Sequence, residues 1–481
     1  MLAGPSTPLV VDLDGTLIKT DLLFETANRF VTRHPFQAPR LAAWLASGKS
    51  VLKTRLAEAC DIDAAALPYN EALITWLREQ KAQGRRLVLA TASHRRLAEA
   101  VARHLGFFDD VLATEGETNL KSRHKRDRLV SLFGEHGFDY VGNDAADLAV
   151  WKSADRAYVV SSSATLVKRV RALGRGVEVF DDGRPPVAAS LFKALRLHQW
   201  MKNLLILVPL FAAHRYGDEA SLLQALLAFF VFGLTASSVY LLNDLVDVAD
   251  DRHHPRKRRR PFASGDLGLV HGWLAWPALA VPAFAIAGAF LPPAFLASLA
   301  AYFVLTLTYS LHLKQLAVVD VLTLAGLYTL RIIAGAAAIA VPLSFWLLTF
   351  SMFVFLSLAF IKRFSELKSA RGQGMSGQLR GRGYFPDDIE MVSSLGAGAG
   401  YIAVLVLALY IQDSHTAELY RNPHLIWLAC PLLLYWISRA WLITHRGQMH
   451  DDPIVFALKD RVSWVVGACF IAVFALAKVA G

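Results

Sequence analysis

Cysteine is scarce in this chain, and the few cysteines form no cluster. Only three occur among 481 residues, Cys60, Cys430 and Cys469. Their positions match no spacing of zinc ligands, and a disulfide scaffold needs more of them. The sequence therefore argues against a disulfide framework and against a structural zinc site.

Two further patterns are missing. The first residues, MLAGPSTPLVVDLDGTL, lack the basic and apolar regions of a secretory signal peptide and lead directly into a predicted strand, so we expect the N-terminal part to stay inside the cell. The net charge of +10 comes without a recognisable nucleic-acid-binding module. We therefore expect no nucleic-acid partner.

Apolar residues, by contrast, are abundant and unevenly distributed. They make up 54% of the chain, and the mean hydropathy is +0.38. Residues 1–190 are mixed and charged, as in a globular domain, whereas about nine apolar stretches of membrane-spanning length follow. We predict spans near residues 199–214, 222–243, 271–291, 293–312, 317–340, 343–361, 395–412, 424–442 and 462–480.

Lysine and arginine are concentrated in two of the loops between these stretches. The loop after the second stretch contains HHPRKRRRP, and the loop after the sixth contains KRFSELKSAR. Because cytoplasmic loops carry the excess of positive charge, both loops should face the cytoplasm. An odd number of spans then places the N-terminal domain on the cytoplasmic side of a bacterial-type inner (plasma) membrane.

The second apolar stretch ends in the acidic sequence NDLVDVADD. On a continuous helix, five of its side chains would share about a 120° arc of one face, namely Asn243, Asp244, Asp247, Asp250 and Asp251. Carboxylates crowded at a membrane edge repel one another unless a cation neutralises them. Oxygen ligands of this kind suit Mg²⁺ shared with a diphosphate, and the basic run that follows suits phosphate. A solvated acidic helix end is the alternative interpretation.

Polar residues also follow three predicted strands in the N-terminal part. Asp12 and Asp14 follow the first strand, in TPLVVDLDGTLIKTD, where open α/β sheets hold their ligands. There Asp12 is placed to attack phosphorus, and Asp14 to protonate the leaving oxygen and then activate water. The second strand, RRLVLATAS, contains Thr91, whose hydroxyl suits a phosphoryl oxygen, although such a threonine is usually a turn residue. The third strand, in FDYVGNDAADLAV, is followed by Asn143, Asp144 and Asp147.

These motifs, DLDGT, the strand-end threonine, a lysine before the third strand and GNDAAD, resemble the haloacid dehalogenase (HAD) superfamily of phosphatases over about residues 7–180. The resemblance implies an α/β fold with a Rossmann-like parallel sheet and a helical cap near residues 20–80. It also implies that Lys125 stabilises the phosphoryl and aspartyl groups, with Lys121 as the alternative, and that Mg²⁺ is bound by residues of the first and third motifs. We place the HAD-like domain at 1–180 and a linker at 181–190.

One departure concerns the predicted metal site. The family usually has Gly-Asp where this chain has Gly142-Asn143. The predicted metal set is therefore Asp12 and Asp14 with the residues after the third strand: Asn143, which still offers a carboxamide oxygen, and Asp144 or Asp147 in compensation. The alternative is a degenerate domain kept as a scaffold or regulatory lobe.

The acidic motif with the following HPRKRRRP run, and about nine helices in all, resembles the UbiA superfamily of intramembrane prenyltransferases over residues 191–481. The resemblance implies an all-α, nine-helix transmembrane bundle that encloses the isoprenoid tail. It assigns Lys257 and Arg260 to phosphate oxygens. It also implies Mg²⁺ and diphosphate binding, with Asp244 and Asp247 central to transfer, by Asn243, Asp244, Asp247 and Asp251.

The segment after the sixth span departs from the prenylating members, which carry a second aspartate-rich motif there. This chain reads FIKRFSELKSARGQGMSGQLRGRGYFPDDIE, with Glu366 as the only carboxylate in the first turns. Fixed cations in place of carboxylates suit a site that binds several phosphate groups. With RLHQWMKNLLIL near the first span, the pattern is similar to the polyprenyl-phosphate phosphoribosyltransferase branch. The phosphate-binding residues predicted here are Asn203, Lys362, Arg363, Glu366 and Tyr384.

The sequence thus predicts a bifunctional membrane enzyme. Its transferase would move phosphoribose from phosphoribosyl diphosphate to a polyprenyl phosphate, and its HAD domain would remove the 5-phosphate from the lipid product. Tethering the two activities would draw the first reaction forward. The alternative is a polyprenyltransferase acting on an aromatic acceptor such as 4-hydroxybenzoate, with a regulatory or degenerate HAD domain.

Overall fold

The computed structural model describes residues 7–115, 120–174, 176–379, 381–412, 420–449 and 453–479. The chain divides into two compact units. The first runs up to Arg196 and also contains Tyr240–Pro277, and the second comprises Leu197–Val239 and the chain from Ala278 onward. The segment that carries the acidic motif and the basic run therefore packs with the N-terminal part. The predicted boundaries at 180 and 190 stay predictions; α9 (Val187–Leu195) begins inside the predicted linker.

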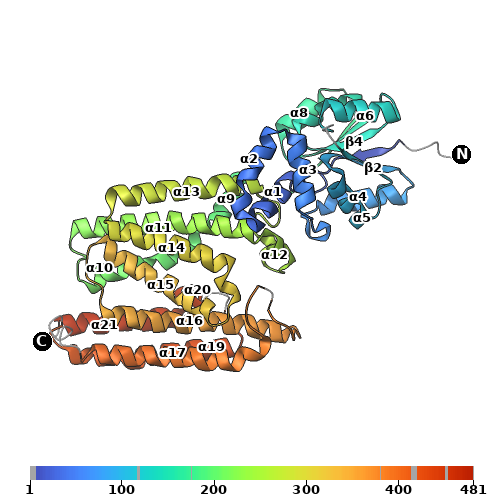
Figure 1. Ribbon diagram of the computed structural model, residues 1–481. Coiled ribbons are helices and arrows are strands. Elements are labelled where there is room, and N and C mark those ends of the chain that lie inside the picture. Colours follow the sequence, from blue (N-terminus) through green and yellow to red (C-terminus); the bar gives the residue numbers. More distant parts are fainter. Residues whose placement is uncertain are drawn as a thin grey trace. The chain divides into compact units, whose positions relative to one another are not determined.

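The first unit contains a six-stranded parallel sheet in the order β3-β2-β1-β4-β5-β6 (Figure 1). The order of the strands reverses at β1, which lies between β2 and β4, and ligands bind at such switch points. The strands are β1 (Leu9–Val11), β2 (Leu87–His94), β3 (Asp110–Thr114), β4 (Asp139–Gly142), β5 (Arg156–Val160) and β6 (Gly176–Phe180).

Both faces of β1 are buried because its apolar residues alternate between two cores. Leu9 and Val11 pack with α4 (Glu71–Ala82) and α5 (Arg95–Leu105). Val10 packs on the other face, against a core that includes α6 (Arg123–Phe133), α7 (Leu148–Ser153) and α8 (Ala164–Arg171). A continuous apolar run is typical of a strand covered on both sides, so the α/β prediction is confirmed.

Between β1 and β2 the chain forms mainly helices, as predicted for residues 20–80. Three of them, α1 (Leu22–Arg33), α2 (Pro39–Ala46) and α3 (Lys49–Ala59), have a core of their own around Phe30, Leu52 and Leu56. The cap role of this insert stays a prediction.

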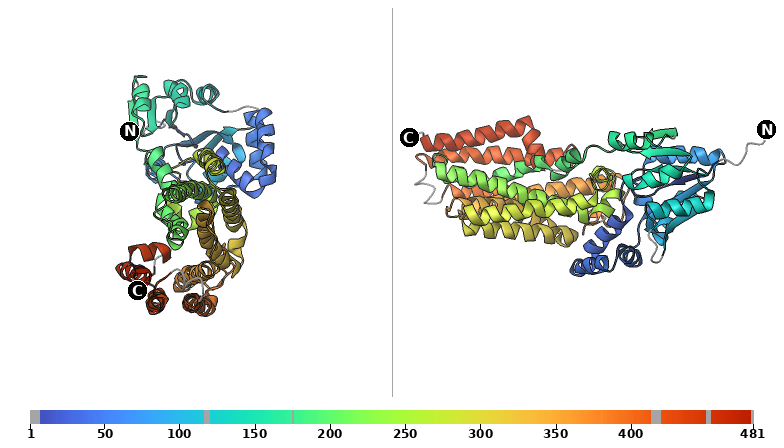
Figure 2. Two further views of the ribbon diagram at one scale, coloured as in Figure 1. Left: turned by 90° about the vertical axis from the view of Figure 1, so that its left-hand side faces the viewer. Right: turned by 90° about the horizontal axis from the view of Figure 1, so that it is seen from above.

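Among the described residues, eight helices are long and apolar enough to cross a membrane, and the protein is a multi-pass membrane protein. Figure 2 shows the bundle from two further directions, with neighbours in sequence such as α16 and α17 side by side. The helices are α11 (Glu219–Val246), α13 (Leu269–Phe290), α14 (Pro293–Leu311), α15 (Val319–Ala338), α16 (Phe345–Gly372), α17 (Ile389–Tyr410), α19 (Ala429–His445) and α21 (Arg461–Val479).

Nine spans were predicted, one more than these eight helices, and the span that is missing is the first, 199–214. It folds as a 3₁₀ segment, η4 (Leu197–Leu207), followed by the short helix α10 (Val208–Ala212). Proline lacks the amide hydrogen that a continuing helix needs, and Pro209 sits where the new helix begins.

The helix that carries the acidic motif is interrupted within the motif. It ends at Val246; Asp247 occupies a bend (φ −86°, ψ 2°), and α12 (Val248–His253) follows. The single acidic face expected for a continuous helix is therefore divided between two helices.

Candidate active sites

Asp12 lies directly after β1 and is paired with Lys125 of α6. The Lys125 Nζ donates to Asp12 Oδ1 at 2.7 Å and to the Tyr140 hydroxyl at 3.0 Å. Both Asp12 and Lys125 are buried. Burial raises the pKa of Asp12 to about 7, although the Lys125 ammonium opposes this rise. The structure thus brings the predicted nucleophile and the predicted lysine together.

Asp14 is held by three hydrogen bonds. The backbone amide of Leu22, the first residue of α1, donates to Oδ1 at 2.9 Å, while Thr91 Oγ1 and Ser93 Oγ donate to Oδ2 at 3.0 and 2.7 Å. Burial raises the pKa of Asp14 to about 6 despite these donors. A carboxyl whose pKa is raised towards neutral pH can give up and take back a proton more readily than an ordinary aspartate, which suits an acid that protonates a leaving oxygen. Sequence reasoning found Thr91 but missed Ser93.

The Asn143 carboxamide is linked to Asp12 through the Thr16 hydroxyl. Thr16 Oγ1 donates to Asn143 Oδ1 at 3.0 Å and lies 3.3 Å from Asp12 Oδ2. Gly15, with φ of +77°, allows this approach, since a Cβ there would lie 2.3 Å from the Asn143 Nδ2. Asn143 is therefore placed where the predicted metal ligand is needed.

The two other predicted metal ligands are engaged differently. Asp147 is buried and accepts from the backbone amides of Asn143 and Asp144, at 3.2 and 3.1 Å, and from the Tyr140 hydroxyl at 2.9 Å. Asp144 is exposed and caps its own turn by accepting from the Ala145 amide. Asp147 thus supports the loop, and Asp144 lies at its surface.

The donor set of Asp12, Asp14 and Asn143 fits Mg²⁺ because it offers carboxylate and amide oxygens. No group of three or more His, Cys, Asp or Glu side chains suited to an ion occurs within the part of the chain that the structure describes. A magnesium ion here would therefore share oxygens with the substrate's phosphate, as Mg²⁺ commonly does.

Replacing Asn143 by aspartate is expected to lower the Mg²⁺ concentration that half-saturates phosphate-ester hydrolysis by about tenfold, because a third carboxylate attracts the ion more strongly. A magnesium titration with p-nitrophenyl phosphate measures this effect. Asp144→Asn is the matched comparison, since it removes one carboxylate from the same loop. If Asp144→Asn raised the half-saturating Mg²⁺ concentration while Asn143→Asp left it unchanged, the ligand would be Asp144 instead.

Lys53 adds a cation that sequence reasoning did not find. It belongs to α3, and its Nζ donates to the Ala92 carbonyl at 2.6 Å, between the Thr91 and Ser93 that bind Asp14. Burial lowers the pKa of Lys53, and the carboxylates of Asp14 and Asp21 oppose this. The helical insert therefore supplies a charged group to the strand ends.

The acidic segment holds two buried carboxylates bound by arginines. Arg196 Nη2 lies 2.5 and 2.7 Å from the two oxygens of Asp244. Arg260 Nη1 lies 3.1 Å from Asp244 Oδ1 and 2.6 Å from Asp251 Oδ2. Burial raises the pKa of Asp251 to about 6, against the effect of Arg260. The bend at Asp247 allows Asp244 and Asp251 to share one guanidinium.

The remaining residues predicted for this segment are more accessible. Asn243, Asp247 and Lys257 are half-buried, and Asp250 is exposed.

Arg196 was not predicted. It has a φ of +51°, a strained backbone conformation for a residue other than glycine, and this conformation ends α9.

A second cluster lies in the other unit, at the end of α16. Arg363 is fully buried and pairs with Asp320 of α15 and with Glu366. The Tyr384 hydroxyl donates to Asp320 Oδ1 at 2.7 Å, and Arg382 Nε lies 3.6 Å from Glu366 Oε2. Three of the predicted residues, Arg363, Glu366 and Tyr384, thus meet around Asp320.

Two other predicted phosphate-binding residues lie elsewhere in this unit. Lys362 is half-buried beside Arg363. Asn203, on η4, is buried, and its Oδ1 accepts from Arg331 Nε at 3.1 Å. Arg331 also donates to the Tyr302 hydroxyl at 3.1 Å. Asn203 therefore belongs to a buried polar group centred on an intramembrane arginine.

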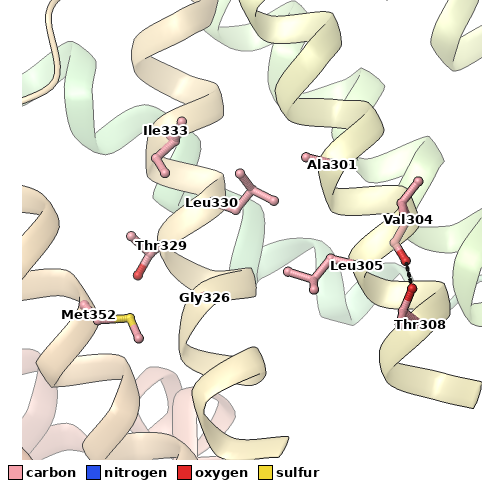
Figure 3. A pocket seen from close by; sticks show the side chains of 9 residues that line it. All are labelled: Ala301, Val304, Leu305, Thr308, Gly326, Thr329, Leu330, Ile333 and Met352. Carbon is pink, nitrogen blue, oxygen red and sulfur yellow. Dashed lines mark hydrogen bonds between the residues drawn. The ribbon is translucent and has the colours of Figure 1, made fainter. Parts of the chain in front are cut away.

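An apolar cavity of about 550 Å³ lies along α14 and α15 (Figure 3). The Thr308 hydroxyl does not make it polar, because it donates to the Val304 carbonyl of its own helix at 2.9 Å. The cavity is lined by Ala301, Val304, Leu305, Thr308, Gly326, Thr329, Leu330, Ile333 and Met352.

Two protein-family models match this chain. Residues 204–462 match the model of the UbiA prenyltransferase family, more than half of the chain. The chain belongs to the UbiA prenyltransferase family. Residues 9–152 match the haloacid dehalogenase-like hydrolase model, so the UbiA domain follows a HAD-like domain. Both resemblances predicted from the motifs are confirmed, and the protein is an enzyme of the transferase class.

Curated relatives of this UbiA protein come from several bacteria. An uncharacterised protein, y4nM, from Sinorhizobium fredii is 36% identical over 98% of this chain and 91% of its own length. The nodulation protein NoeC from Azorhizobium caulinodans is 40% identical over 57% of this chain and 88% of its own. Decaprenyl-phosphate phosphoribosyltransferase from Mycobacterium tuberculosis is 33% identical over 60% of this chain and 95% of its own.

Among solved structures, this UbiA protein is similar to a UbiA homologue from Archaeoglobus fulgidus bound to GPP and Mg²⁺. The TM-score is 0.46 and the identity 17%, with 60% of this chain and all (100%) of that chain covered.

Proposed function

We propose that the UbiA domain transfers phosphoribose from phosphoribosyl diphosphate to a polyprenyl phosphate. The observation that carries this proposal is the cluster at the end of α16, where the half-buried Arg382 lies beside Glu366 and the fully buried Arg363 holds Glu366 in place. Relatives that bear the name decaprenyl-phosphate phosphoribosyltransferase support it, since four of them match this chain at 33–34% identity. Guanidinium groups bind phosphate in a forked geometry, so they suit substrates with several phosphates.

We assign the acidic segment to the donor's diphosphate. Asp244 and Asp251 already bind two guanidinium groups, from Arg196 and Arg260. These arginines can exchange a carboxylate oxygen for a phosphate oxygen, and their cationic side chains balance charge either way. Mg²⁺ bound here would neutralise the departing diphosphate. Because the described residues gather no three such carboxylates around one ion, Asp244, Asp247 or Asp251 would share the ion with oxygens of the diphosphate.

The transfer reaction itself requires little from a strong base. The bond between the ribose anomeric carbon and the diphosphate oxygen breaks, and a lipid phosphate oxygen forms the new bond to that carbon. The acceptor oxygen is already ionised, so the protein's contribution is to position the two substrates and balance their charge. The apolar cavity along α14 and α15 suits the isoprenoid tail of the acceptor.

We further propose that the HAD-like domain removes the 5-phosphate from the lipid product. Asp12 would attack phosphorus to form an aspartyl phosphate, while Asp14 gives its proton to the departing ribose oxygen. Asp14 would then accept a proton from the water that releases inorganic phosphate. The buried pair of Asp12 and Lys125, 2.7 Å apart, supports this assignment. Both domains would then act on the cytoplasmic side of the inner membrane, as the basic loops indicate.

A comparison of labelled donors tests the transferase assignment. Purified protein in lipid nanodiscs, supplied with polyprenyl phosphate and Mg²⁺, should consume labelled phosphoribosyl diphosphate and label the lipid. A labelled prenyl diphosphate, offered with 4-hydroxybenzoate, should be left unchanged. The opposite pattern would assign the protein to aromatic prenyl transfer and reject the proposal.

A further inference from the structure

Helix α1 carries two buried polar side chains, Glu25 and Asn28, that the phosphatase chemistry does not use and that bind partners beyond the helix. Glu25 and Asn28 are 8% and 6% exposed. Both oxygens of Glu25 accept from Arg252, with its Nη1 at 3.0 Å and its Nη2 at 2.7 Å. Asn28 Nδ2 donates to the Leu245 carbonyl at 2.8 Å, and Asn28 Oδ1 accepts from Trp273 Nε1 at 2.9 Å. All three partners belong to the 240–277 segment of the first unit.

The hydrogen bonds of this network leave little room for movement. Arg252 Nε donates to the Ala263 carbonyl at 3.1 Å, so all three guanidinium nitrogens are used. Glu25 also accepts from Thr20 Oγ1 at 2.7 Å. A buried, bidentate ion pair of this kind fixes orientation as well as distance. Helix α1 is therefore fixed to the segment that carries the acidic motif.

The same helix holds Asp14 at its first residue. The Leu22 amide donates to Asp14 Oδ1, and Glu25 lies three residues later, about 4.5 Å along the helix axis. A rotation or shift of α1 at Glu25 would move the Leu22 amide away from Asp14. The anchor and the phosphatase site are thus joined by less than one helical turn.

The anchoring residues are also neighbours of the buried carboxylates of the transferase segment. Leu245 follows Asp244, and Arg252 follows Asp251. We propose that Arg252, acting through Glu25, is a positioning residue for Asp14, so that the acidic segment of the transferase sets the geometry of the phosphatase site. This inference rests on the phosphatase role proposed above. Arg252 itself makes no contact with Asp12 or Asp14.

The double variant Glu25→Leu/Arg252→Met tests the inference in the full-length protein. Removing both partners of a buried pair leaves no unpaired charge, so the fold should survive. Either single substitution would leave a buried charge without its partner. We expect kcat for p-nitrophenyl phosphate to fall at least fivefold with KM within twofold. Hydrogen exchange of the peptide from Leu22 to Arg33 should accelerate at least tenfold. Arg252→Lys keeps the charge and part of the hydrogen bonding. Its kcat and its exchange rate should therefore lie between those of the wild type and of the double variant.

A second buried ion pair in the same domain provides the control. Arg85 and Asp139 pair at the start of β4, with side chains 12% and 4% exposed, and neither residue contacts α1. Arg85→Met/Asp139→Leu should leave kcat and the exchange of α1 within twofold of the wild type. If the Glu25/Arg252 double variant loses stability, Asn28→Ala breaks the neighbouring anchor alone and should show the same local acceleration of exchange.

Two outcomes would overturn the inference. One is unchanged exchange of α1 in the double variant. The other is an unchanged kcat in that variant while Asp12→Asn is inactive. A wild-type protein without Asp12-dependent hydrolysis would instead reject the phosphatase role. Hydrogen exchange still decides in that case whether the anchor positions α1.

Discussion

Asp244→Asn is expected to reduce transfer of phosphoribose to the lipid by at least about 10³-fold, equivalent to about 4 kcal/mol of transition-state stabilisation. Asp244 is almost completely buried and is the carboxylate that both Arg196 and Arg260 contact. Its loss removes charge from the predicted metal set and leaves two cations without their shared partner. Transfer of label from phosphoribosyl diphosphate to polyprenyl phosphate measures the effect.

The matched control is Asp250→Asn, which removes an exposed carboxylate from the same segment. It should leave transfer within twofold of the wild type. Hydrolysis of p-nitrophenyl phosphate serves as the folding control for Asp244→Asn, because that reaction requires Asp12 and should continue. If Asp244→Asn silenced both activities in folded protein, the two-site account would be wrong. If it transferred label normally, the acidic segment would not bind the donor.

Much of the fold could be predicted because its signals are local. The apolar run before Asp12 predicts a doubly covered strand, and the structure places β1 at the centre of the sheet. The membrane helices follow from apolar length alone. The first predicted span was different: its composition is apolar, yet Pro209 and the 3₁₀ segment before it interrupt the helix. Average hydropathy does not record such a break.

The candidate sites were less predictable, because their partners are distant in sequence. Arg196 lies 48 residues from Asp244, and its left-handed backbone leaves no recognisable pattern. Asp320 lies 43 residues from Arg363, so the sequence indicated fixed cations for phosphate where the structure pairs Arg363 with a buried carboxylate. The helical arc of the acidic motif assumed a continuous helix, and the bend at Asp247 changed which carboxylates meet.

The HAD-like site contains both kinds of residue, those that the sequence predicted and those that it did not. Lys125 came from a family resemblance, and its Nζ does contact Asp12. Lys53 and Ser93 came from no motif, because a lysine on an amphipathic helix or a serine near a strand end is common. Only the folded insert brings the Lys53 ammonium to the strand that carries Ser93.

Asp12→Asn is expected to stop release of inorganic phosphate from the phosphoribosyl lipid, with a rate reduction of at least about 10⁴-fold. An amide oxygen is a far weaker nucleophile than a carboxylate, and no aspartyl phosphate can form. The transferase should continue, so the 5-phosphorylated lipid should accumulate in place of the dephosphorylated product. Chromatography of lipids made from labelled phosphoribosyl diphosphate separates the two species.

Asp109→Asn provides the comparison for this variant, because it removes an exposed carboxylate that pairs with Lys81 on the same domain. It should yield the same products as the wild type. The wild type must itself yield mainly the dephosphorylated lipid. If it yielded only the 5-phosphorylated lipid at excess Mg²⁺, the domain would be a scaffold, and Asn143 in place of aspartate would be the physical reason. If Asp12→Asn still released phosphate from the lipid, the nucleophile would have to be another residue, because the amide cannot replace the carboxylate.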